Sequence, residues 1–162
     1  DPLIKSQRRS RQLAMSRNRM IAAVAGADVV MVNPTHFAVA IKYEPGKSAP
    51  RVVAKGAGQI AARIREQAET DKVPIVKDIP LTRALHSACE LGDEIPAELY
   101  TAVARVLAFV MSLKARGTST GGVHTGPDAN RPPVHYDATP VRHRNRRRDP
   151  ALETTPPNPG GH

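Results

Sequence analysis

The pattern of apolar and polar positions divides the chain into short strands, longer helices and a final segment without periodicity. The apolar run from Val29 to Val32 suits a strand that is buried on both faces, and residues 37–43 follow as a second strand. Further along the chain, apolar residues recur at helical spacing. We therefore expect strands at 29–32, 37–43, 51–55 and 73–77, and helices at 3–25, 58–70, 80–91 and 96–116.

The order of these elements predicts the fold class. Strands and helices alternate after residue 50, which is typical of an α/β domain whose sheet is at least partly parallel. The first two strands have no helix between them, so the sheet is expected to be mixed. We predict an α/β fold with a small mixed β-sheet of about four strands flanked by about four helices, a basic N-terminal helix and a disordered C-terminal tail.

Composition divides the chain into three parts. Residues 1–25 are strongly basic, and residues 26–116 contain every predicted strand. Residues 117–162 are rich in Gly, Pro, Thr, His and Arg without periodicity, so they bury too little apolar surface to offset the entropy of ordering, and we expect disorder there. The histidines of this tail lack zinc-finger spacing and cysteine partners, and no metal site is expected.

Charge and composition exclude several classes of function. The net charge of +9 is concentrated at the two ends of the chain, and only 3% of the residues are aromatic. Without a nucleic-acid-binding motif or aromatic side chains for base stacking, no nucleic-acid partner is expected. Cys89 is the single cysteine, which excludes an intramolecular disulfide and fits a reducing compartment. No apolar stretch reaches the roughly 18 residues of a membrane span.

Asn33-Pro34-Thr35-His36 separates the first two strands. Pro34 has no N–H to give to a strand ladder and biases Asn33 towards extended or turn geometry. The purely structural interpretation is a tight turn, because Asn and Pro are common turn residues.

The same residues also allow a specific reaction. In most Asn-X sequences the next backbone nitrogen attacks the Asn side chain, but Pro34 lacks the N–H for that route. The Asn33 amide nitrogen can instead attack its own main-chain carbonyl carbon, forming a succinimide and expelling Pro34. His36 carries an imidazole, a side chain that can accept and donate protons, so it could assist proton transfer. The turn is therefore a candidate site of self-cleavage.

Residues 33–36 followed by 37–43 resemble the self-cleaving signature of the FlhB/YscU family, the substrate-specificity switch proteins of flagellar and injectisome type III export. The resemblance extends from residue 1 to about residue 115. Other blocks that resemble the family are 1–5, 19–20, 27–30, 53–56, 63–66, 73–76, 80–85 and 94–100.

The resemblance implies a cytoplasmic domain of an export component, and the flagellar branch is preferred over the injectisome branch. By this resemblance Asn33 supplies the nucleophile and the scissile carbonyl, and Pro34 is the leaving group. Thr35 shapes the turn, and His36 assists proton transfer or positions the loop. The domain would cut itself once and would not be a turnover enzyme. Residues 1–25 would be a juxtamembrane linker, and 26–116 the self-cleaving domain.

The resemblance also implies a location and partners. The full-length protein is expected at the cytoplasmic face of the bacterial inner membrane, with transmembrane helices upstream of Asp1. Expected partners are other membrane components of the export apparatus, export substrates and their chaperones, and the hook-length or needle-length control protein. Arg8, Arg9 and Arg11 could contact an anionic membrane surface. No cofactor is expected.

Three alternatives stay open. One is an injectisome homologue with the same mechanism, and another is a stand-alone binding module in which Asn33-Pro34 is an inert turn. The third is a dinucleotide-binding domain, because residues 56–61 fit the relaxed G-x-G-x-x-A fingerprint between a predicted strand and helix, with Asp78 about twenty residues on. The third is less favoured, because the strand before these glycines is not the first strand of the chain.

Overall fold

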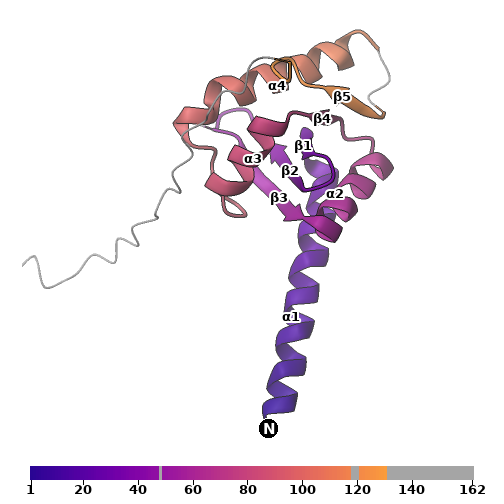
Figure 1. The fold of residues 1–162 in the computed structure, drawn as a ribbon, viewed down its shortest axis with the longest axis vertical. Helices are drawn as coiled ribbons and strands as arrows, with labels where there is room; N and C mark the ends of the chain where they lie inside the picture. The colour runs from indigo at the N-terminus through magenta and orange to yellow at the C-terminus, as the bar shows by residue number, and fades with distance from the viewer. Residues whose placement is uncertain (48, 118–120, 131–162) are drawn as a thin grey trace, which may run out of the picture.

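The computed structural model describes residues 1–47, 49–117 and 121–130 (Figure 1). Helix α1 (Pro2–Ala23) begins at Asp1, whose Oδ1 accepts a hydrogen bond from the Leu3 N–H at 3.1 Å. The helix extends away from the rest of the fold (Figure 1), and Ile21 near its end is its buried residue. Its basic side chains are exposed. This agrees with the predicted basic N-terminal helix.

A five-stranded mixed sheet forms the centre of the molecule, in the order β3-β2-β1-β4-β5. Strands β1, β2 and β3 are antiparallel neighbours, whereas β4 runs parallel to β1 and β5 runs parallel to β4. The mixed sheet confirms the predicted fold class. The strands are β1 (Val29–Asn33), β2 (Phe37–Lys42), β3 (Arg51–Ala57), β4 (Ile75–Lys77) and β5 (Val123–Thr125).

Helices cover both faces of the sheet (Figure 1). Helix α2 (Gly58–Thr70) packs with the end of α1 against one face, in a core that includes Val30 and Val32. Helices α3 (Ile79–Ala88) and α4 (Tyr100–Ala115) pack against the other face, in a core that includes Met31. β1 therefore lies between two hydrophobic cores, which explains its uninterrupted apolar sequence. Short 3₁₀ helices, η1 (Val24–Gly26) and η2 (Ala97–Leu99), precede β1 and α4.

The glycines between β3 and α2 have structural roles. A Cβ atom at Gly56 would lie 2.3 Å from Cγ2 of Ile60, so only glycine allows the strand and helix to approach this closely. Gly58 has φ of +56°, a conformation that favours glycine. β3 is also an edge strand and antiparallel to its neighbour. The dinucleotide-binding alternative is therefore not supported, because that motif follows a parallel strand inside the sheet.

β5 was not among the strands expected from the sequence, because it lies in the segment predicted to be disordered. The chain returns after α4 and places residues 123–125 along the free edge of β4. Residues 118–120 and 131–162 of that segment lie outside the described residues, so disorder there stays a prediction. Among the residues that the structure describes, no helix combines the length and apolar character needed to cross a bilayer.

Candidate functional site

The sheet places Asn33 at the end of its most buried strand. Asn33 is the last residue of β1 and pairs with Phe37, the first residue of β2. Its side chain is almost fully buried, with 5% of the residue exposed, whereas Pro34, Thr35 and His36 are exposed. The turn thus presents three residues to solvent and keeps the Asn33 carboxamide inside.

Two backbone hydrogen bonds hold this turn. The His36 N–H donates to the Asn33 carbonyl oxygen at 2.7 Å, and the Gly58 N–H at the start of α2 donates to the His36 carbonyl oxygen at 3.1 Å. The first bond draws electron density away from the carbonyl carbon between Asn33 and Pro34. The second fixes the turn to a helix that packs on the sheet. The carbonyl group is therefore both polarised and held in place.

The backbone of His36 contacts Asn33 more directly than its side chain does. Its ring meets the ring of Phe37 edge-on, with 6.4 Å between the ring centroids and an interplanar angle of 62°. The ring is otherwise at the surface, where water can exchange protons with it. The four predicted site residues thus share one turn, with Asn33 inside and the other three outside.

The layer beneath the turn contains groups that sequence reasoning did not place there. The Phe37 ring stacks at a tilt on His86 of α3, with 4.3 Å between the centroids. Burial, and then the positive charge of Lys55, lower the pKa of His86 from its ordinary value. The Lys55 ammonium donates to the carbonyl oxygens of His86 and Cys89 at 3.0 and 2.9 Å, which satisfies the C-terminal end of α3.

Cys89 lies in this layer as a core residue. Burial is the main reason that its thiol pKa is raised to about 11, and the nearby carboxylate of Asp93 acts in the same direction. A thiol with this pKa is almost entirely protonated near neutral pH and is a poor nucleophile. The structure therefore makes Cys89 a packed core residue.

Asp78 is a second buried polar residue beside Asn33. Its N–H donates to the Val32 carbonyl oxygen at 3.2 Å, so it continues the ladder between β4 and β1. Side chains alternate along strands, and Met31 and Val76 share a core, which places Asn33 and Asp78 towards the same face. Burial raises the pKa of Asp78, against the lowering effect of the Leu81 N–H that its carboxylate accepts. Its position beside Asn33 was not expected from the sequence.

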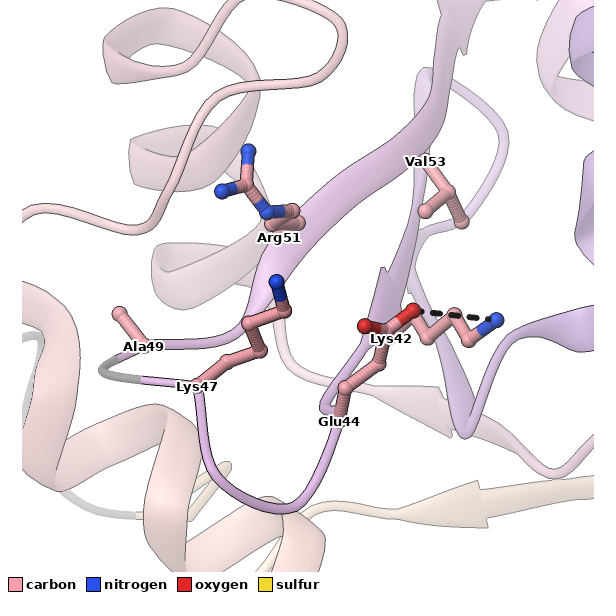
Figure 2. Close-up of a pocket in the computed structure, with 6 residues that line it drawn as sticks. All are labelled: Lys42, Glu44, Lys47, Ala49, Arg51 and Val53. Atoms are coloured by element: carbon pink, nitrogen blue, oxygen red, sulfur yellow. Dashed lines mark ion pairs between the residues drawn. The ribbon is translucent and has the colours of Figure 1, made fainter.

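A small cavity lies at the far end of β2 from the turn, against the loop that leads into β3 (Figure 2). Its volume of about 50 Å³ is too small for a nucleotide. Its cations are partly neutralised, because Lys42 pairs with Glu44 at 3.5 Å and Arg51 pairs with Glu94 at 3.2 Å. The residues around it are Lys42, Glu44, Lys47, Ala49, Arg51 and Val53.

In the described part of the chain, no cluster of three or more His, Cys, Asp or Glu side chains is arranged to hold a metal ion. The turn supplies reactive atoms of its own. It offers a buried carboxamide, a polarised carbonyl group next to it, and a proline nitrogen as the leaving group.

Comparison with known proteins gives a consistent result. Residues 1–110 match the model of the FlhB HrpN YscU SpaS family. The chain is 51% identical over 124 residues to the flagellar biosynthetic protein FlhB of Yersinia enterocolitica, covering 76% of this chain and 32% of that protein. It is also 51% identical over 115 residues to FlhB of Escherichia coli strain K12, covering 70% and 30%. The chain thus spans about a third of the length of these curated relatives.

The fold has a solved counterpart. The crystal structure of the cytoplasmic domain of FlhB from Shewanella putrefaciens is similar with a TM-score of 0.64 and 38% sequence identity. The match covers 76% of this chain and 99% of that domain.

Proposed function

Because the chain belongs to the FlhB HrpN YscU SpaS family, we propose that it is the cytoplasmic domain of a flagellar protein-export component that cuts itself between Asn33 and Pro34. Cleavage would help to switch the class of substrate that the apparatus exports. The flagellar assignment rests on the similarity to flagellar FlhB proteins. The cleavage assignment rests on the turn.

The proposed reaction is an internal acyl transfer. The Asn33 side-chain nitrogen attacks the Asn33 main-chain carbonyl carbon and loses a proton. The bond from that carbon to the Pro34 nitrogen then breaks, and the nitrogen gains a proton. The products are a succinimide at Asn33 and a new N-terminus at Pro34. The reaction consumes its own site, so it is a single event in the life of each chain.

The hydrogen bond from the His36 N–H to the Asn33 carbonyl oxygen is the observation that carries this proposal. Negative charge develops on that oxygen as the ring closes, and a donor already 2.7 Å away stabilises it without rearrangement. The burial of Asn33 supports the same proposal, because it restricts the side chain to few orientations and so favours the one from which the nitrogen can attack. Thr35 would shape the turn, and the exposed His36 ring would exchange protons with water.

The two pieces should stay together after cleavage. β1 would remain paired with β2 along five residue pairs and with β4 on its other side, while α2 and α3 hold both faces. The cut would therefore free residues 34–36 without unfolding the sheet. We infer that the altered turn changes the surface offered to export substrates, their chaperones and the hook-length or needle-length control protein.

The exposed basic helix suggests a second set of contacts. Arg8, Arg9 and Arg11 lie on the free part of α1, where they could meet anionic lipid or other membrane components of the export apparatus. Each cation near such a surface contributes about 1 kcal/mol. The proposed location is the cytoplasmic face of the inner membrane.

Intact-mass spectrometry of the full chain under denaturing conditions tests the cleavage. We expect two species, one ending at Asn33 and one beginning at Pro34, and only the full-length mass for Asn33→Ala, because no carboxamide remains to close the ring. Pro34→Ala restores a backbone N–H and should divert part of the reaction to deamidation, seen as a gain of about one dalton.

Fragments that persist in Asn33→Ala would exclude cyclisation of this residue. A single full-length species in the parent chain, unchanged after incubation at mildly alkaline pH, would favour the non-cleaving binding module.

A further inference from the structure

Residues 121–130 form the last described segment, and they close an edge of the sheet that would otherwise be open. β4 and β5 pair in parallel, with Val76 opposite His124 and Lys77 opposite Thr125. The Gly126 N–H donates to the Lys77 carbonyl oxygen at 2.9 Å. An uncovered strand edge exposes unpaired backbone groups and readily accepts another strand. The chain therefore supplies its own partner to this edge.

Two side-chain contacts join the segment to α4. Val123 is 55% exposed, so it contributes little burial. The His124 ring meets Phe109 of α4 edge-on, with 6.3 Å between the centroids. Arg105 of α4 pairs with Asp128 at 3.3 Å, at a site open to solvent on the arginine side. β5 is also a three-residue strand at the margin of the sheet. The backbone ladder adds the pairing with β4.

The contact also leaves polar atoms unsatisfied. Among the described residues, the buried side-chain polar atoms without a hydrogen-bond partner are Asp78 Oδ2, Thr82 Oγ1 and His124 Nε2. His124 belongs to β5, Asp78 is covered by Gly126, and Thr82 lies one helical turn beyond Asp78 on α3. Burying such atoms costs free energy, and undocking the segment would return His124, which belongs to it, to water. Docking of the segment is therefore opposed by the free energy of burying this polar atom.

We propose that the edge of β4 is a peptide-binding site and that residues 121–130 occupy it as a reversible strap. The site accepts an extended peptide that runs parallel to β4. Backbone hydrogen bonds provide its affinity, as in other cases of strand addition. This inference rests on the fold and does not depend on self-cleavage.

Gly126 gives the site its selectivity. A Cβ atom there would lie 3.1 Å from the Lys77 carbonyl oxygen and 3.3 Å from Asp78 Cβ. Both neighbours are anchored, the first in the strand and the second at the start of α3, so they have little room to move. A Cβ atom is therefore disfavoured at this position, and a bound peptide with glycine there fits best. A valine would add two further methyl groups against the same atoms.

The backbone of β4 provides a local reporter of the strap. The Lys77 carbonyl accepts from Gly126, so the N–H of Lys77 also points towards β5. Backbone N–H groups alternate in direction along a strand, so the N–H of Val76 points towards β1. This agrees with Asp78, two residues on, whose N–H donates to the Val32 carbonyl oxygen of β1. Hydrogen exchange at Lys77 therefore reports the strap, and exchange at Val76 reports the sheet itself.

The test is amide hydrogen exchange by NMR on the full chain. We expect Gly126→Val to raise the exchange rate of Lys77 by at least about tenfold and to leave Val76 unchanged. Val123→Thr, an outward-facing change in the same strand, should leave both amides at the parental rate. A peptide of residues 121–130 should restore Lys77 protection in Gly126→Val, whereas the same peptide with valine for Gly126 should not.

Unchanged Lys77 exchange in Gly126→Val would overturn the proposed contact. Equal acceleration of Val76 and Lys77 would mean that the segment is an integral part of the sheet and not a strap. Failure of the parental peptide to protect Lys77 would refute the binding site. None of these outcomes bears on the mass spectrum, so the strap and the cleavage can fail separately.

Discussion

At the residue scale, Asn33 and His36 contribute different groups to the turn, a side chain from Asn33 and a backbone N–H from His36. Asn33 brings a buried carboxamide, and His36 brings the N–H that donates to the Asn33 carbonyl oxygen, next to the bond that we propose is cleaved. The sequence made the His36 imidazole the natural candidate for a chemical role. The structure adds a backbone role at the same position, and the two can be separated by substitution.

His36→Pro removes the N–H, whereas His36→Ala keeps it and removes only the ring. We expect the proline variant to slow self-cleavage about 100-fold or more, the usual effect of losing one donor to a developing oxyanion. His36→Ala should slow the reaction much less. The rates can be followed by mass spectrometry after refolding from denaturant, with circular dichroism to confirm the fold. Equal rates in the two variants would assign the effect to the ring.

At the element scale, the end of α3 depends on a distant strand. Helix C-termini leave carbonyl groups without partners inside the helix. Here the Lys55 ammonium of β3 donates hydrogen bonds to the carbonyl oxygens of His86 and Cys89. This bond joins β3 to the helix that packs beneath Phe37. Lys55 thus links the elements that support the turn.

Lys55→Met keeps the length of the side chain and removes its charge and donors. We expect a loss of about 2 kcal/mol in the free energy of unfolding, because two part-buried carbonyl groups lose a charged partner. Urea denaturation followed by circular dichroism measures this loss. Lys5→Met makes the same chemical change at an exposed position of α1 and should have little effect. Equal stability of the two variants would contradict the capping role.

At the scale of the whole molecule, the burial of His86 between the helices and the sheet makes the stability of the fold depend on pH. The pKa of His86 is lowered by burial first and by the charge of Lys55 second. The unfolded chain therefore binds a proton at this residue more readily than the folded chain does. Stability must fall as pH is lowered below the ordinary histidine pKa of 6.5, because protonation favours unfolding.

His86→Gln removes this proton-binding group. We expect the denaturation midpoint of the parent chain to fall more steeply than that of His86→Gln as pH is lowered below about 6.5. Urea titrations of both proteins over this range measure the difference, and the other histidines cancel in the comparison. Parallel curves would mean that His86 is equally free to bind a proton in both states.

Local sequence determined much of the architecture. The apolar run at Val29–Val32 predicts β1 because a strand between two helical layers has no polar face, and the helices follow from their apolar spacing. The Asn33-Pro34 turn follows from the missing proline N–H. These features depend on neighbours in the sequence, so sequence patterns reveal them.

Only the tertiary structure decided the pairings between distant segments. The sequence does not show that Lys55 caps α3, that His86 stacks on Phe37, or that residues 123–125 join the edge of β4. β5 is too short to show a period and is flanked by glycines, so nothing local distinguishes it from a loop. Its formation depends on an edge made by other strands. The sequence thus determined the other elements and the Asn33-Pro34 turn, while packing determined β5 and the contacts around the turn, because such contacts exist only once the layers have assembled.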